Sequence, residues 1–128
     1  MVDASVFVRA VADDGSDGDT ARQAMATDEL AAPEIIDLEV ISSLRGLNRS
    51  GYLTNERSSQ AMFELATAPI DRASHQPLIS RIWELRHNVT AYDASYIALA
   101  EAWDAPLLTA DRKLASAPGV RCEVELIS

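Results

Sequence analysis

Acidic residues stand at three points of this chain where folding could bring them together. Asp3 follows the first two residues, Asp93 lies in the first turn of a predicted helix, and Asp111 comes just after a short apolar strand. In α/β folds, sites form beyond the carboxyl ends of the strands. The pattern therefore predicts a metal site that is assembled only in the folded chain.

A fourth carboxylate, Glu39, belongs to the same set, and each member has a structural alternative. A carboxylate at the end of a central strand is costly unless it is paired or bound to metal, which favours a functional Asp3. Glu39 could be an exposed residue of a long helix. Asp93 could stabilise the start of its own helix, and Asp111 could cap a short turn at 112–115. The four positions together make the functional case.

Two hydroxyl residues are placed to support these carboxylates. Ser5 could hydrogen-bond Asp3 or a metal-bound water, and it could equally cap the first helix. Thr109, at the end of a predicted strand, could orient Asp111. Both residues are therefore predicted to support the site without taking part in the chemistry.

Strands and helices alternate along the chain. The predicted strands are 1–2, 29–33, 69–71, 107–109 and one or two within 120–127; the predicted helices are 5–12, one from about 20, 34–50, 54–67, 74–85 and one from 90, with an acidic loop at 13–19. This alternation is typical of a parallel sheet covered on both faces. Residues 1–128 are therefore predicted to form one α/β domain, a short parallel sheet flanked by helices in three layers.

Composition limits the classes of function. The net charge of −9 argues against a surface that holds nucleic acid by bulk electrostatics, although bound cations can reverse the sign inside a site. Ten of the eleven basic residues are arginine, which suits phosphate, but ordinary ion-paired side chains explain most of them. The single cysteine, Cys122, excludes an internal disulfide and fits a reducing, cytoplasmic location. No apolar run approaches the roughly 18–20 residues of a membrane span.

Four longer motifs surround the acidic residues. They are Val2-Asp-Ala-Ser-Val6, Ala32-Pro-Glu-Ile-Ile-Asp-Leu-Glu-Val-Ile-Ser-Ser-Leu-Arg45, Tyr92-Asp-Ala-Ser-Tyr-Ile-Ala-Leu-Ala-Glu101 and Leu108-Thr-Ala-Asp-Arg-Lys-Leu114. In this order and spacing the chain resembles the PIN domain, and within it the VapC-type toxins of bacterial toxin–antitoxin (VapBC) pairs. The first strand is shorter than in many relatives, because only two residues precede Asp3.

The resemblance implies a PIN-like fold and a Mg²⁺-dependent ribonuclease, with Mn²⁺ able to substitute. It assigns the four acidic positions to Asp3, Glu39, Asp93 and Asp111. Like charges about 4 Å apart repel by roughly 4 kcal/mol at an effective dielectric near 20, and a hard divalent cation relieves that repulsion. We expect Asp3 and Asp93 to contact the metal and Asp111 to complete its shell. Glu39 would position or deprotonate the attacking water, with no covalent intermediate.

The resemblance also implies partners. They are a cognate VapB-type antitoxin that inhibits the ribonuclease in a toxin–antitoxin hetero-oligomer, an RNA substrate, and a second copy of the chain in a homodimer. Arg112, beside Asp111, is predicted to bind the RNA, with Lys113, Arg9 and Arg45 as further candidates.

A different class of function remains open, a catalytically inactive PIN-like module that binds another chain through Phe7, Val8 and Val11. The presence of all four acidic residues favours the enzyme over this module. Trp83, Trp103 and Phe63 are interpreted as core side chains and not as platforms for stacked bases.

Overall fold

The structure is a computed structural model that describes residues 1–26 and 29–127. Its elements are α1 (Ala4–Ala12), α2 (Ser16–Met25), β1 (Leu30–Pro33), α3 (Ile36–Arg49), α4 (Asn55–Thr67), β2 (Ile70–Ala73), the 3₁₀ helix η1 (Gln76–Leu78), α5 (Ile79–Glu84), α6 (Ala91–Ala102), β3 (Leu107–Thr109), α7 (Arg112–Ala115) and β4 (Val124–Leu126). The predicted alternation of strands and helices is confirmed.

The sheet consists of two parallel pairs, β1 with β2 and β3 with β4, joined by the start of the chain. The Val2 N–H donates to the carbonyl of Ala31 at 3.1 Å, and Val2 forms a parallel bridge with Leu108. The first predicted strand therefore occupies its expected central place. It consists of this single bridge, after which Asp3 forms the N-cap of α1.

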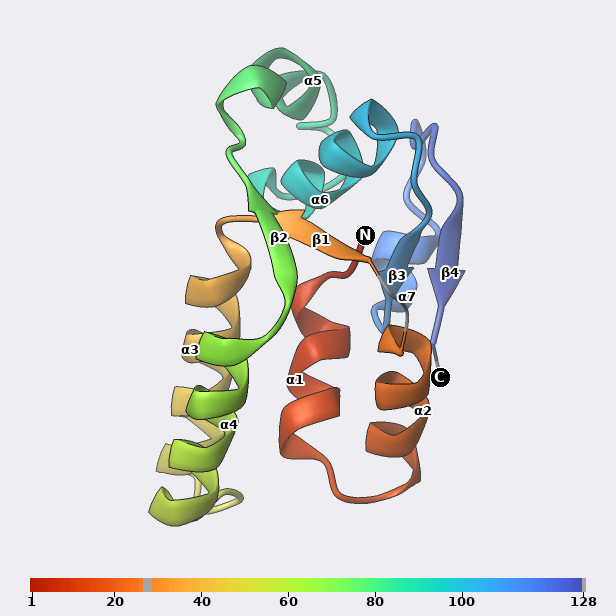
Figure 1. Cartoon of the computed structure of the whole chain (residues 1–128). Coiled ribbons are helices and arrows are strands. Elements are labelled where there is room, and N and C mark those ends of the chain that lie inside the picture. Colours follow the sequence, from red (N-terminus) through yellow and green to blue (C-terminus); the bar gives the residue numbers. More distant parts are fainter. Residues whose placement is uncertain (27–28, 128) are drawn as a thin grey trace.

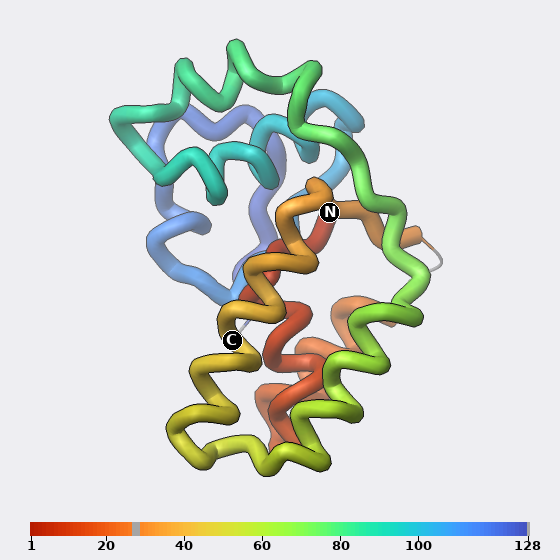
Figure 2. The backbone as a smooth tube through the Cα atoms, turned by 90° about the vertical axis from the view of Figure 1, so that its left-hand side faces the viewer, coloured from red at the N-terminus to blue at the C-terminus, as the bar shows by residue number. Residues whose placement is uncertain are grey.

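Helices lie on both sides of the strands, as predicted for three layers. Figure 1 shows α5 and α6 above the strands and α1 to α4 below them. The tube in Figure 2 shows α3 and α4 running antiparallel beside each other. No helix in the described part of the chain is long and apolar enough to cross a membrane.

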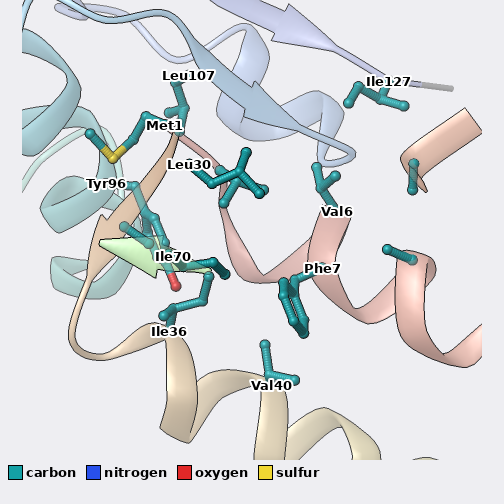
Figure 3. Close-up of a cluster of buried hydrophobic side chains, with 14 of the residues drawn as sticks. Met1, Val6, Phe7, Leu30, Ile36, Val40, Ile70, Tyr96, Leu107 and Ile127 are labelled. Carbon is teal, nitrogen blue, oxygen red and sulfur yellow. The ribbon is translucent and has the colours of Figure 1, made fainter. Parts of the chain in front are cut away.

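The core between these layers is apolar. Phe7 of α1 lies beside Val40 of α3, and Val6 of α1 lies on the side toward Ile127 (Figure 3). Full burial of one such side chain stabilises the fold by about 1.5–3 kcal/mol. The predicted apolar stripe of α3 is confirmed, because Ile36, Val40 and Leu44 are all buried.

The helix α6 passes through this core and is buried on nearly every side. All residues from 94 to 100 are buried. The hydroxyl oxygen of Thr90 accepts a hydrogen bond from the N–H of Asp93 at 3.2 Å, which confirms the predicted helix start. Asp93 precedes the buried run, so its side chain is only half-buried.

The predicted acidic loop at 13–19 was wrong for its second half. The Asp13 carboxylate accepts the N–H of Gly15 at 2.7 Å and turns the chain, and α2 begins at Ser16 and not near Thr20. Asp17 lies in the first turn of α2, where the positive end of the helix dipole stabilises acidic residues.

Three aromatic residues that were expected in the core are exposed, among them Trp103 at 49 %. Phe63 is 69 % exposed because α4 buries Ala61 and Leu65, which lie on the opposite face of that helix. Trp83 is 66 % exposed, and the guanidinium of Arg86 lies 4.5 Å from the centre of its ring.

The face formed by Phe7, Val8 and Val11 is not a free binding surface. Phe7 and Val11 are buried, and Val8 packs partly buried against the core. These side chains point inward because the strands and the neighbouring helices cover that side of α1. The prediction of an interaction module that uses this face is therefore wrong.

Candidate active site

One cavity brings together all four carboxylates that the sequence singled out. It has a volume of about 350 Å³. Its lining residues are Asp3, Ala4, Ser5, Glu39, Ser42, Ser43, Asp93, Tyr96 and Asp111. The acidic residues come from four separate segments: the end of the central bridge, α3, α6 and the loop after β3. Folding is therefore what creates the acidic site.

Asp3 is the most enclosed of the four, at 5 % exposed. Its Oδ1 accepts hydrogen bonds from the hydroxyl of Ser5 at 2.5 Å and from the N–H of Val6 at 3.3 Å, so that Asp3 is the N-cap of α1. Its Oδ2 accepts from the hydroxyl of Thr109 at 2.5 Å. Burial nevertheless raises the pKa of Asp3 above its ordinary value, because the hydrogen bonds oppose the loss of hydration only in part.

Ser5 and Thr109 both hydrogen-bond Asp3, and each of them also joins two segments. The oxygen of Ser5 accepts the N–H of Ala110 at 3.0 Å, which ties the start of α1 to the loop after β3. The oxygen of Thr109 accepts the N–H of Asp111 at 3.0 Å while its hydroxyl donates to Asp3. The alternative of Ser5 as a helix cap was wrong, since Asp3 occupies that position.

The pKa of Asp93 responds to the other acidic side chains of the site. Burial is the largest cause that raises the pKa of this carboxyl, and the charges of Asp111, Glu39 and Asp3 raise it further. The four acidic side chains therefore interact electrostatically. A concentration of negative charge of this kind favours a bound cation.

Asp111 is exposed at the mouth of the cavity and has two compatible roles. Its Oδ1 accepts the N–H of Lys113 at 2.9 Å, which makes it the N-cap of α7. The structural alternative considered for this residue is thus real. The carboxylate also lines the cavity, so capping does not remove it from the acidic set.

Sequence reasoning missed three polar residues of the lining. The hydroxyl of Tyr96 donates to Oε1 of Glu39 at 2.6 Å, which links α6 to α3 across 57 positions. Ser42 and Ser43 also line the cavity. Their spacing of three and four residues after Glu39 places them on its face of α3, a signal that was available in the sequence.

The donors of this cavity fit a hard divalent cation on chemical grounds, because they are carboxylate and hydroxyl oxygens. Within residues 1–26 and 29–127, however, no group of three or more His, Cys, Asp or Glu side chains is arranged to hold a metal ion. Mg²⁺ commonly keeps several waters and binds proteins through only one or two carboxylates.

The basic candidates lie outside the lining of this cavity. Arg112 is exposed in the first position of α7, directly after Asp111, and Lys113 is exposed beside it. Other arginines are held in ion pairs, such as Arg72 with Asp37 at 2.9 Å and Arg81 with Glu101 at 2.7 Å. The predicted binding of RNA by Arg112 stays a prediction.

Comparison with known proteins agrees with this arrangement of fold and site. The PIN domain profile matches residues 1–120. Ribonuclease VapC1 of Mycobacterium tuberculosis (strain ATCC 25618 / H37Rv) is 41% identical over 128 residues, which cover 99% of this chain and 96% of the relative. VapC ribonuclease Mb0985 of Mycobacterium bovis (strain ATCC BAA-935 / AF2122/97) is 38% identical over 130 residues, which cover 99% and 97%. The chain therefore belongs to the PIN-domain family, within its VapC-type ribonucleases.

Proposed function

We propose that this chain is a Mg²⁺-dependent endoribonuclease and the toxin of a toxin–antitoxin pair, which hydrolyses RNA phosphodiester bonds with an activated water. The observation that supports this best is the cavity lined by Asp3, Glu39, Asp93 and Asp111. The names of the VapC relatives describe ribonucleases, which supports the same reaction class.

Each carboxylate has a distinct task in this proposal. Asp3 and Asp93 would hold the cation, and Asp111 would complete its shell. Bound there, Mg²⁺ or Mn²⁺ would lower the pKa of a water molecule and neutralise charge on the phosphate oxygens. Ser5 and Thr109 keep Asp3 in one orientation through their hydrogen bonds. Glu39 positions or deprotonates the attacking water, and its Oε1 accepts a hydrogen bond from Tyr96.

Cleavage of total cellular RNA by the antitoxin-free chain tests this proposal. We expect discrete fragments with Mg²⁺ or Mn²⁺, none with EDTA, and at least a 100-fold slower reaction for Asp93→Asn. The matched control is Asp71→Asn, which makes the same change at an exposed position of β2 outside the cavity and should cleave at the wild-type rate. A folded wild type that cuts nothing with either metal would favour an inactive, partner-binding PIN domain.

The partners in this proposal are a VapB-type antitoxin, cytoplasmic RNA and a second copy of the chain. A homodimer is supported by an apolar cavity of about 480 Å³ between α5 and α6. The exposed Ile79, Trp83 and Tyr92 lie around it. Exposed apolar patches of this kind mark protein interfaces. Sedimentation of the free chain as a monomer at micromolar concentration would count against the homodimer.

A further inference from the structure

The hydroxyl of Tyr96 is a polar group carried into the core by a buried helix. The side chain is 1 % exposed and packs among Ile36, Ile70 and other apolar residues, with its oxygen directed toward α3 (Figure 3). A buried hydroxyl in such surroundings needs a partner. Its partner is Oε1 of Glu39, at 2.6 Å.

The direction of this hydrogen bond is fixed by chemistry. A carboxylate only accepts, so the Tyr96 hydroxyl must donate. Burial, together with the negative charge of Glu39, raises the pKa of Tyr96, and the hydroxyl therefore keeps its proton. Tyr96 is thus a permanent neutral donor and is not itself a base.

The bond constrains a side chain that is otherwise poorly held. Within the described part of the chain, Asp3 receives hydrogen bonds from two hydroxyls and a backbone N–H, whereas the donor to the Glu39 side chain is Tyr96. Glu39 is only half-buried and faces the charge of Asp93, which favours rotation toward solvent. A donor on the rigid helix α6 opposes that rotation.

We propose that Tyr96 is a positioning residue that acts through Glu39. Its hydroxyl holds Oε1 and leaves Oε2 as the oxygen available to the attacking water, so the helix that carries Asp93 also sets the orientation of the proposed base. This inference rests on the proposed ribonuclease function. Groups that orient catalytic side chains in this way typically contribute 10–100-fold to activity.

The test is a double-mutant cycle on an RNA oligonucleotide that carries the strongest cleavage site found in total cellular RNA. Tyr96→Phe should lower kcat about 10-fold and leave KM within twofold of wild type. In a Glu39→Gln background, assayed at high enzyme concentration, the same change should cost less than twofold. Tyr52→Phe, at an exposed position between α3 and α4, makes the same chemical change and should leave kcat unaltered.

The Phe variant should fold, because the ring that fills the core is retained and the freed Glu39 carboxylate can reach water. Thermal unfolding checks this. Wild-type kcat in Tyr96→Phe would overturn the positioning role while the ribonuclease proposal stands. An equal loss in both backgrounds would likewise overturn it, in favour of a general structural effect. An inactive wild type would overturn both proposals, and the reaction of the wild-type chain alone reveals that outcome.

Discussion

Asp3 faces two demands on its protonation state. A bound cation needs the ionised carboxylate, whereas burial favours the neutral acid and raises its pKa above the ordinary value of 3.8. The folded chain therefore binds this proton more tightly than the unfolded chain. The stability that the group contributes is full below pH 3.8 and is lost as the pH rises through the folded-state pKa.

We therefore predict that Asp3→Asn stabilises the metal-free chain at neutral pH while it abolishes RNA cleavage. Each tenfold difference in proton affinity between the two states is worth about 1.4 kcal/mol. For a domain of this size that is roughly 5 °C in melting temperature. The measurement is thermal unfolding in EDTA from pH 4 to 8, where the advantage of the variant should shrink as the pH falls.

Wild type and variant differ at one titrating group. The contributions of the other acids therefore cancel when the two melting temperatures are subtracted at each pH. Addition of Mn²⁺ should raise the melting temperature of the wild type and not that of Asp3→Asn. A variant that is less stable by a constant amount at every pH would contradict the prediction. It would mean that the hydrogen bond from Thr109 to the carboxylate outweighs the cost of burial.

The sequence was sufficient to identify the carboxylates and two of their hydrogen-bond partners, Ser5 and Thr109, but not Tyr96. Asp3, Asp93 and Asp111 could be found because strand ends and helix starts are recognisable from short apolar runs and capping residues, and the resemblance gave Glu39 its role. The contact between Tyr96 and Glu39 joins positions 57 residues apart, which no local pattern encodes. The exposure of Trp83 was missed because a helix as short as α5 has too few turns to define an apolar face.

At the scale of elements, Asp111 is both the N-cap of α7 and part of the acidic cavity, and mutation can separate these two roles. Asparagine caps a helix about as well as aspartate, whereas alanine costs about 1 kcal/mol. We predict that Asp111→Asn and Asp111→Ala both cleave RNA 10–100-fold more slowly, because each removes the carboxylate from the cavity. Only Asp111→Ala should also unfold at a lower temperature.

Parallel RNA-cleavage assays and thermal melts of the two variants measure this difference. Full activity in Asp111→Asn together with a loss in Asp111→Ala would show that the residue acts only as the cap of α7.

Helix boundaries were predictable where capping residues are explicit. Thr54 and Thr90 start α4 and α6 as expected, because each hydroxyl oxygen accepts a backbone N–H three residues later. The start of α2 was misplaced because Gly15 and Ser16 are typical of turns. The Asp13 carboxylate closes such a turn on the N–H of Gly15, and the helix begins directly after it. The segment predicted as one helix at 74–85 is divided into η1 and α5.

At the scale of the whole molecule, a net charge of −9 must be reconciled with a polyanionic substrate. Long-range attraction cannot supply the affinity, so binding has to depend on a few local contacts and on cations in the site. Each phosphate contact contributes about −0.7 to the slope of log K against log salt for single strands. An acidic chain that uses few basic residues should therefore show a shallow slope.

Arg112 is the residue on which we test this expectation, because it is exposed and adjoins Asp111. Arg112→Ala should weaken binding of a labelled single-stranded RNA and make the slope shallower by about 0.7. Fluorescence anisotropy from 50 to 300 mM KCl measures both effects, with Asp93→Asn as the common background so that the RNA stays intact. Arg49→Ala, which removes an exposed charge at the far end of α3, should leave the slope unchanged. Equal effects of the two variants would mean that the chain senses RNA through its overall charge and that Arg112 makes no contact of its own.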